Sequence, residues 1–289
     1  MSYTAEEYAA ASAICRRNAL KDKMDAGGIG YSFGLQTTLN PEIALMAKIA
    51  GYDALLLNLE HSKTGLETFN AIACAALAEN VAPIVVVPSL QSDWISRSLD
   101  VGAQGIIVPR VGTAAQAAEL VKYAKYRPHG ERPLADTPAQ RYQLMGMNFV
   151  ANMTVTNERV LAIPMIETVE GLENVEAIAA TPGVDMLFVG TFDLTDDMGI
   201  AGQYDDPRLA AAYERICKAA EAQWTETRKV YVGCGGIEWR PDMMRDLSLK
   251  YKSIRYFMAG RDSTVLLNGM KAQAGAMAEL DAQVLAARK

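Results

Sequence analysis

Short runs of almost continuous hydrophobic residues recur along the chain and alternate with segments in which apolar residues return every three or four positions. Eight of the runs are predicted to be strands, at 30–35, 54–58, 83–87, 105–108, 161–166, 186–189, 229–232 and 254–258. Several of them lack the inside–outside alternation of a half-exposed sheet. This pattern favours a parallel sheet whose strands are buried on both faces by covering helices.

The segments between these runs carry helix signals. Asn40 and Pro41 lead into EIALMAKIAG, which gives an N-cap, a first-turn proline and a terminal glycine. Further helices are predicted at 92–102, 113–125 and 168–180. Eight strands alternating with helices is the count of a (β/α)8 TIM barrel, the α/β fold class that we predict. Doubly wound sheets show the same alternation but usually have fewer strands.

Three segments fall outside this alternation. Residues 1–27 are predicted to form an N-terminal helical extension, and residues 263–289 a long C-terminal helix that either closes the barrel or is exchanged between subunits. Residues 127–159 contain no clean strand and are interpreted as an irregular insertion after the fourth strand, near the barrel mouth or in a subunit contact. We therefore expect residues 1–289 to form a single barrel domain with these additions.

Composition adds mainly exclusions. The length of 289 residues suits one barrel, which needs about 250 residues. A net charge of −6 without a basic cluster argues against a nucleic-acid partner. The four cysteines lack CxxC spacing, and no run of about 18 apolar residues or signal peptide is present. A cytoplasmic protein without a membrane partner is expected.

Charged residues directly follow four of the predicted strands. Glu60 and His61 follow ALLLN, Arg110 follows GIIVP, Glu167 follows LAIPMI and Asp193 follows MLFVG. Each has a structural interpretation, such as a helix-capping acid or a salt-bridge partner. The carboxyl ends of barrel strands, however, form the face that carries the active site. The coincidence of these residues on that face predicts a catalytic centre.

Two of these carboxylates suit a metal ion. Glu167 and Asp193 would leave open positions on a hard divalent cation such as Mg²⁺ or Mn²⁺. Such a cation binds a 2-oxo acid through two oxygens and stabilises an enolate as a Lewis acid. The chemistry also needs a base, a role for which histidine is well suited, and His61 is the candidate.

Three blocks of the chain, GYDALLLNLEH, DVGAQGIIVPRVGTAAQA and PMIETVEGLENVEAIAATPGVDMLFVGTFDLT, resemble the HpcH/HpaI aldolase family. The resemblance extends from about Gly34 to Asn268. It implies a metal-dependent, class II aldolase that forms no Schiff base and acts on pyruvate or a related 2-oxo acid. Members of this family often assemble as hexamers, or trimers of dimers, and exchange their C-terminal helices.

The resemblance also implies which residues bind metal and substrate. The metal ligands are Glu167 in MIET and Asp193 in GTFDL, and Mg²⁺, Mn²⁺ and Co²⁺ all remain open. The backbone just before the aspartate, at Gly190, Thr191 and Phe192, is expected to hold the substrate carboxylate. Thr191 replaces the proline that the family has in this motif.

The catalytic set departs further from the family pattern. His61 is expected to transfer a proton beside Glu60, but the aspartate that partners this histidine in the family is Asn58 here. Val86 stands where the family has an arginine that polarises the substrate ketone, and Met165 where it has a glutamine. Losing the arginine would cost several kcal/mol of transition-state stabilisation, on the order of 3.

Other cations are candidates to replace that arginine. Arg110 follows a strand directly, and His129 and Arg132 lie in the segment interpreted as irregular. The family glycine that follows this last arginine is Pro133 here. Val86 and Met165 favour a substrate less polar than a sugar acid.

These observations predict a carbon–carbon lyase, an aldolase that cleaves or forms a bond beside the carbonyl of a 2-oxo acid or another enolisable ketone through a metal-stabilised enolate. One alternative is an oxaloacetate decarboxylase or an enolate-driven cyclase of the macrophomate synthase type. Another is a catalytically degenerate member that binds a metabolite. The expected partners are a small-molecule substrate and further copies of the chain.

Overall fold

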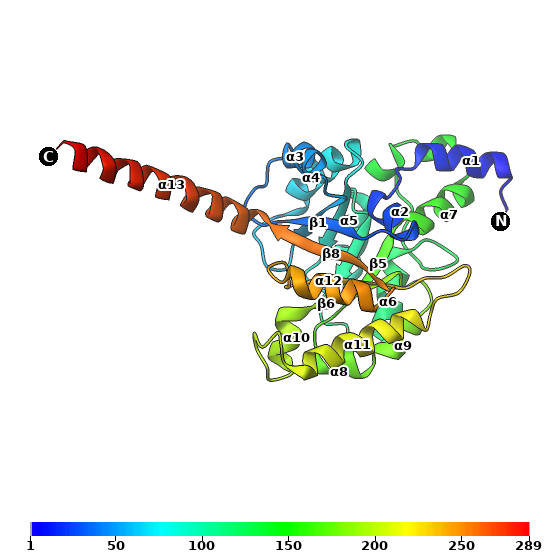
Figure 1. The fold of residues 1–289 in the computed structure, drawn as a ribbon. Coiled ribbons are helices and arrows are strands. Elements are labelled where there is room, and N and C mark those ends of the chain that lie inside the picture. The colour runs from blue at the N-terminus through cyan, green and yellow to red at the C-terminus, as the bar shows by residue number, and fades with distance from the viewer. Residues whose placement is uncertain (1, 289) are drawn as a thin grey trace.

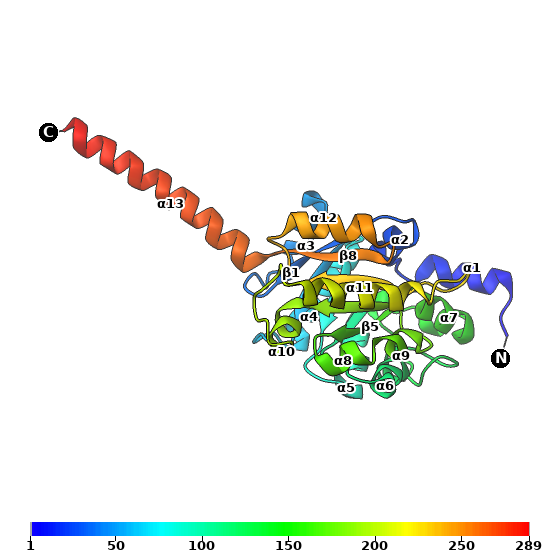
Figure 2. The same ribbon diagram turned by 60° about the horizontal axis from the view of Figure 1, so that its bottom comes forward.

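The computed structural model describes residues 2–288 and shows a closed barrel of eight parallel strands in the order β1-β2-β3-β4-β5-β6-β7-β8. The strands are β1 (Gly30–Leu35), β2 (Ala54–Asn58), β3 (Ala82–Val86), β4 (Gly105–Val108), β5 (Leu161–Ile166), β6 (Met186–Gly190), β7 (Tyr231–Gly235) and β8 (Ile254–Arg261). Figures 1 and 2 show the helices wrapped around this barrel. The TIM-barrel prediction is confirmed.

The helices alternate with the strands. They are α1 (Ala5–Ile14), α2 (Ala19–Asp25), α3 (Ile43–Ala50), α4 (Leu66–Ala78), α5 (Ser92–Asp100), α6 (Ala114–Ala124), α7 (Phe149–Arg159), α8 (Val169–Glu173), α9 (Val175–Ala180), α10 (Thr191–Asp197), α11 (Pro207–Glu221), α12 (Pro241–Lys250) and α13 (Asp262–Ala287). Short 3₁₀ turns lie at Pro138–Gln140 and Leu144–Gly146. Among the described residues, none of these helices is long and apolar enough to cross a membrane.

Large side chains fill the interior of the barrel, and glycines on β7 make room for them. Phe188 and Tyr256 belong to the buried interior cluster. A Cβ on Gly233 would lie 2.6 Å from the Tyr256 ring, and one on Gly235 would lie 2.7 Å from the Phe188 ring. Glycine is depleted in strands, so the sequence pattern places this strand at 229–232, which begins two residues and ends three residues before the observed β7.

The second N-terminal helix, α2, closes the lower end of the barrel. Leu20 and Met24 of α2 join the interior cluster at the end where the strands begin. The helix α1 packs against α7, which occupies the second half of the segment 127–159. The predicted location near the barrel mouth is wrong, because Thr154 and Asn157 of α7 lie at the end where the strands begin. Residues 127–148 are irregular apart from two short 3₁₀ turns, whereas residues 149–159 form a capped helix. A role of this segment in a subunit contact stays a prediction.

The last helix, α13, projects away from the barrel (Figures 1 and 2). Its first residue, Asp262, is buried and accepts hydrogen bonds from the backbone N–H groups of Gln36, Thr37 and Thr38. These bonds fix the direction in which the helix leaves β8. Beyond them the helix is exposed, including large apolar side chains: Val265, Leu266, Leu267, Met270, Met277, Leu280 and Leu285.

Candidate active site

A buried carboxylate lies at the carboxyl end of β5. Glu167 is only 5% exposed, and its Oε1 atom accepts a 2.8 Å hydrogen bond from the backbone N–H of Arg110. Arg110 adopts a backbone φ of +53°, which is uncommon for a residue other than glycine. Its side-chain Nη2 atom lies 3.8 Å from Oδ1 of Asp193 at the start of α10. The structure thus brings together residues that follow β4, β5 and β6.

Negative charge accumulates at this end of the barrel. Burial raises the pKa of Glu167 to about 7, the Arg110 N–H opposes that rise, and nearby Asp193 and Glu60 add to it. Burial also raises the pKa of Glu60, whereas His61 and Arg110 lower it. Carboxylates that are desolvated and mutually repulsive in this way are suited to a divalent cation.

The donor set fits a cation that keeps several non-protein ligands. Within residues 2–288, no group of three or more histidine, cysteine, aspartate or glutamate side chains is arranged to hold a metal ion. Glu167 and Asp193 therefore provide at most two carboxylate ligands. Mg²⁺ and Mn²⁺ accept such sites, because water and substrate oxygens complete their octahedral coordination.

Glycine at position 190 is required by the carboxylate beside it. A Cβ on Gly190 would lie 2.6 Å from Oε2 of Glu167 and 2.9 Å from the sulfur of Met165. Real Cβ atoms do not approach other atoms so closely, so a side chain at this position would displace the Glu167 carboxylate, the Met165 sulfur or both. Gly190 therefore shapes the site by having no side chain.

The loop after β2 is organised by Asn58. Its Oδ1 atom accepts hydrogen bonds from the backbone N–H groups of Glu60 (2.8 Å) and His61 (2.9 Å). The amide oxygen of Asn58 therefore binds the main chain of this loop and not the His61 ring. The nearest charged partner of the exposed His61 ring is Glu60, with Nε2 3.5 Å from Oε2.

The floor of the site is apolar. Val86 and Met165 are buried in the interior cluster at the upper ends of β3 and β5. Thr191 is also buried, and its hydroxyl lies 2.6 Å from that of Tyr213 and donates to the carbonyl oxygen of Gly235 at 2.7 Å. The Thr191 side chain therefore anchors α10 to β7 and is not directed at a ligand.

An aromatic wall, formed by Phe192, Trp239 and Tyr204, borders the site on the side of α10. The Phe192 ring is 45% exposed and lies 5.2 Å from the Trp239 ring, which contacts Tyr204 edge-on at 5.4 Å. The sequence analysis named Phe192 only for its backbone, and it missed Trp239, Tyr204 and the neighbouring pair of Glu238 and Arg261. The signal was available, because Glu238 and Arg261 stand at or just after the ends of β7 and β8.

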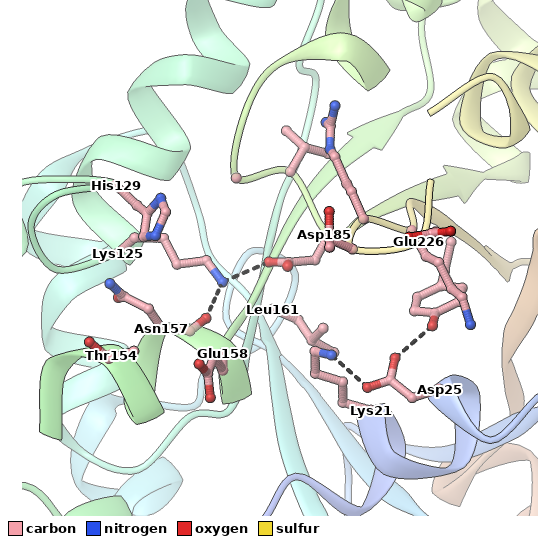
Figure 3. A pocket seen from close by; sticks show the side chains of 16 residues that line it. Lys21, Asp25, Lys125, His129, Thr154, Asn157, Glu158, Leu161, Asp185 and Glu226 are labelled. Atoms are coloured by element: carbon pink, nitrogen blue, oxygen red, sulfur yellow. Dashed lines mark hydrogen bonds and ion pairs between the residues drawn. The ribbon is translucent and has the colours of Figure 1, made fainter. Parts of the chain in front are cut away.

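The cavity shown in Figure 3 lies at the other end of the barrel, where the strands begin. It measures about 520 Å³, and four of its charged side chains form two ion pairs. Lys125 lies 2.8 Å from Asp185, Lys21 lies 2.7 Å from Asp25, and the Tyr231 hydroxyl donates to Asp25. In barrels this face contributes to stability and not to catalysis.

Two sequence candidates lie outside the site. His129 lines the cavity at the lower end of the barrel. Arg132 is buried, with Nη2 2.8 Å from Asp100, and stacks over the Tyr126 ring. The suggestion that either residue replaces the family arginine is wrong, because the insertion that carries them packs at the lower end of the barrel. Arg110 is the one of the three that reaches the carboxylates.

Comparison with known proteins agrees with this geometry. The family model HpcH/HpaI aldolase/citrate lyase matches residues 36–231. The 4-hydroxy-4-methyl-2-oxoglutarate aldolase of Hapsidospora irregularis is 33% identical over 271 residues, covering 92% of this chain and 97% of that protein. The aldolase of the same name from Chaetomium globosum is 32% identical over 267 residues, covering 91% and 96%. The crystal structure of an HpcH/HpaI aldolase from Desulfitobacterium hafniense matches with a TM-score of 0.80 at 26% identity, over 89% of this chain and 96% of that one.

Proposed function

This chain belongs to the HpcH/HpaI aldolase/citrate lyase family and is an aldolase of that family, and we propose that it cleaves and forms 4-hydroxy-4-methyl-2-oxoglutarate. Cleavage of the bond between C3 and C4 of this compound gives two molecules of pyruvate. Two observations support the proposal. Relatives of that name match nearly the full length of the chain, and a buried glutamate lies beside an aspartate at the barrel mouth.

Glu167 and Asp193 would hold a divalent cation, with Mg²⁺ and Mn²⁺ the best fits to two carboxylates. A bound cation supplies positive charge where negative charge develops on the 2-oxo oxygen. The burial of Glu167 and its hydrogen bond from Arg110 keep its carboxylate in one place. Position matters because a preorganised charge needs no rearrangement during the reaction.

The proton of the C4 hydroxyl must leave during cleavage and return during synthesis. His61 is the proposed acceptor, since its exposed ring stands at the mouth and contacts Glu60. Glu60 would stabilise the imidazolium that forms. Val86 and Met165 would contact the apolar carbons of the substrate from below, which suits a methyl-bearing substrate better than a polyhydroxylated one.

Assembly into a homo-oligomer is part of the proposal. The apolar side chains of α13 are exposed along its length, and α3 also exposes Leu45, Met46 and Ile49. Exposed apolar surfaces of this extent usually mark protein–protein contacts. A second copy of the chain is the proposed occupant, with α13 packed against the neighbouring barrel.

The test is release of pyruvate from 4-hydroxy-4-methyl-2-oxoglutarate, followed with lactate dehydrogenase. Turnover should require Mg²⁺ or Mn²⁺, stop with a chelator and disappear in Glu167→Gln. Glu170→Gln, which changes an exposed glutamate of α8, is the control and should retain activity. If CO₂ is released from oxaloacetate while the aldol is left intact, the decarboxylase alternative replaces this proposal.

A further inference from the structure

A bulge near the end of β8 changes the direction of one side chain. Ser32 pairs with Met258 and Gly34 pairs with Arg261, so β8 contains one more residue than β1 over this stretch. Bulges of this kind re-aim side chains beside active sites. Ser32 and Met258 face the barrel interior, where the Ser32 hydroxyl accepts from Tyr256. Residues paired in parallel strands share a face, so Arg261 is turned toward the inside of the mouth.

The Arg261 side chain extends across the rim toward α10. A Cβ on Gly34 would lie 3.6 Å from its Cγ atom. Its guanidinium carbon lies 5.4 Å from the centroid of the Phe192 ring. Phe192 directly precedes the proposed metal ligand Asp193. The guanidinium thus lies at the mouth, beside the site, on the β8 side.

Glu238 holds one part of this guanidinium and leaves the other part available. Nε of Arg261 lies 2.7 Å from Oε1 of Glu238, whose side chain is only 11% exposed. Among the described residues, Nη1 and Nη2 of Arg261 make no hydrogen bond to the protein, and Nε meets Glu238 as an ion pair without hydrogen-bond geometry. The side chain is 34% exposed, so these two nitrogens remain accessible to a ligand.

The forked end of a guanidinium fits a carboxylate through two parallel hydrogen bonds. The neighbouring rings of Phe192 and Trp239 exclude some of the water that would weaken such a pair. The floor offers no competing cation, because Val86 and Met165 are apolar. A second carboxylate on the substrate is therefore the group best matched to Arg261.

We infer that Arg261 binds the C5 carboxylate of the substrate and thereby selects a 2-oxo acid, not a neutral aldehyde, as the acceptor in the aldol reaction. Glu238 is a positioning residue that orients the guanidinium through Nε. The inference rests on the proposed function, because it concerns the substrate of the same site. It adds the residue that distinguishes a dicarboxylic substrate from a monocarboxylic one.

The kinetic test compares 4-hydroxy-4-methyl-2-oxoglutarate with 4-hydroxy-2-oxovalerate, in which C5 is a methyl group and not a carboxylate. In Arg261→Gln, the ratio of the two kcat/KM values should fall about 10- to 100-fold, as expected for lost hydrogen bonds to a charged group. The fall should appear mainly in KM for the dicarboxylate. Arg261→Lys should recover part of it. Arg240→Gln is the matched control, because this rim arginine is already occupied by Asp205 and Asp242.

A binding test separates this inference from the proposed activity. The dissociation constants of 2-oxoglutarate and 2-oxovalerate, which differ at C5 in the same way, are measured by calorimetry in the presence of Mg²⁺. In Arg261→Gln, the dissociation constant of 2-oxoglutarate should rise about 10-fold or more, and that of 2-oxovalerate should stay the same. If the wild type cleaves neither aldol but this difference appears, the proposed function fails and Arg261 still binds a carboxylate. The inference is overturned if Arg261→Gln prefers the dicarboxylate over the monocarboxylate as strongly as the wild type does in both assays.

Discussion

The backbone N–H of Arg110 is hydrogen-bonded to Oε1 of Glu167 at 2.8 Å, joining the loop after β4 to the carboxylate after β5. This bond is made possible by the left-handed backbone of Arg110, whose φ is +53°. It stabilises the ionised form of Glu167, but burial has the larger effect on the pKa. The site therefore holds the Glu167 carboxylate in position but does not neutralise its negative charge. A bound cation would do so.

This balance predicts a pH dependence for the metal-free protein. The folded pKa of Glu167 is raised from 4.5 to about 7, so folding favours its protonated form. The stability that results is fully present below the unfolded value and is lost as the pH rises through about 7. Relative to Glu167→Gln, the wild type should lose at most about 3 kcal/mol between about pH 5 and pH 8.

Urea unfolding of both proteins in a chelator at the two pH values measures this loss. Added Mg²⁺ should restore the stability of the wild type at the higher pH, because the ion binds the deprotonated carboxylate. The glutamine variant should show neither change. A stability difference that does not vary with pH would mean that Glu167 titrates normally and is not desolvated.

The close approach of Gly190 to Glu167 predicts that Gly190→Ala is inactive. The added Cβ would lie 2.6 Å from Oε2, so the carboxylate must move. We expect a loss of at least about 100-fold in kcat/KM together with weaker Mg²⁺ binding, since a displacement of about 1 Å is costly in a preorganised site. Gly146→Ala, where no atom lies within 4 Å of the added Cβ, is the control for a glycine substitution as such. Wild-type metal affinity in Gly190→Ala would contradict the assignment of Glu167 as a ligand.

The two hydrogen bonds accepted by Asn58 predict a structural role for its side chain. Asn58→Asp retains an acceptor for the N–H groups of Glu60 and His61 and should fold normally. Asn58→Leu removes the acceptor and should lower the free energy of unfolding by about 1–3 kcal/mol. Urea denaturation compares the two. Equal stability of both variants would show that solvent can replace the lost acceptor.

Lys125 predicts that the lower cavity stabilises the fold without taking part in catalysis. Its ammonium group is buried, pairs with Asp185 and donates to the carbonyl oxygens of Asn157 and Val160. Lys125→Met should destabilise the protein by about 3–5 kcal/mol, because Asp185 loses its partner. At a temperature where the variant is folded, kcat/KM should match the wild type. A large fall in kcat/KM of the folded variant would instead assign the cavity a role in the reaction.

The sequence pattern predicted the strands well where burial is continuous. The bounds of β1, β2, β4 and β5 agree with the predicted runs. Both faces of β4 and β5 are buried throughout, and β2 is buried up to Asn58, whereas β1 exposes Tyr31. The pattern failed for elements whose residues are chosen for close packing or are only weakly patterned, so that no clear hydrophobic period marks them. The glycines of β7 accommodate two aromatic rings, and α7 is amphipathic only weakly, so neither element stands out in the sequence.

The same contrast applies to the site. Charged residues directly after buried strands indicated Glu60, Arg110, Glu167 and Asp193, and the structure brings these together. The orientation of Arg261 depends on a bulge, which no hydrophobic period reveals. Hydrogen bonds from side chains to the main chain, such as those that Asn58 accepts, also cannot be predicted from a hydrophobic period.

The exposed apolar side chains of α13 predict that the oligomer depends on this helix. Leu266 and Met270 lie one helical turn apart and are 47% and 66% exposed. Replacing both with glutamate would place charges in the proposed interface, where burial without partners is strongly unfavourable. Light scattering should then show a smaller assembly than the wild type forms. Lys271→Glu, which alters charge at a position that is already polar, should leave the mass unchanged. The barrel of the double variant should still fold, because within residues 2–288 the contacts of α13 with the barrel are concentrated on β1 and β8, where Asp262 anchors it. A double variant with the wild-type mass would show that α13 is not the surface through which the copies associate.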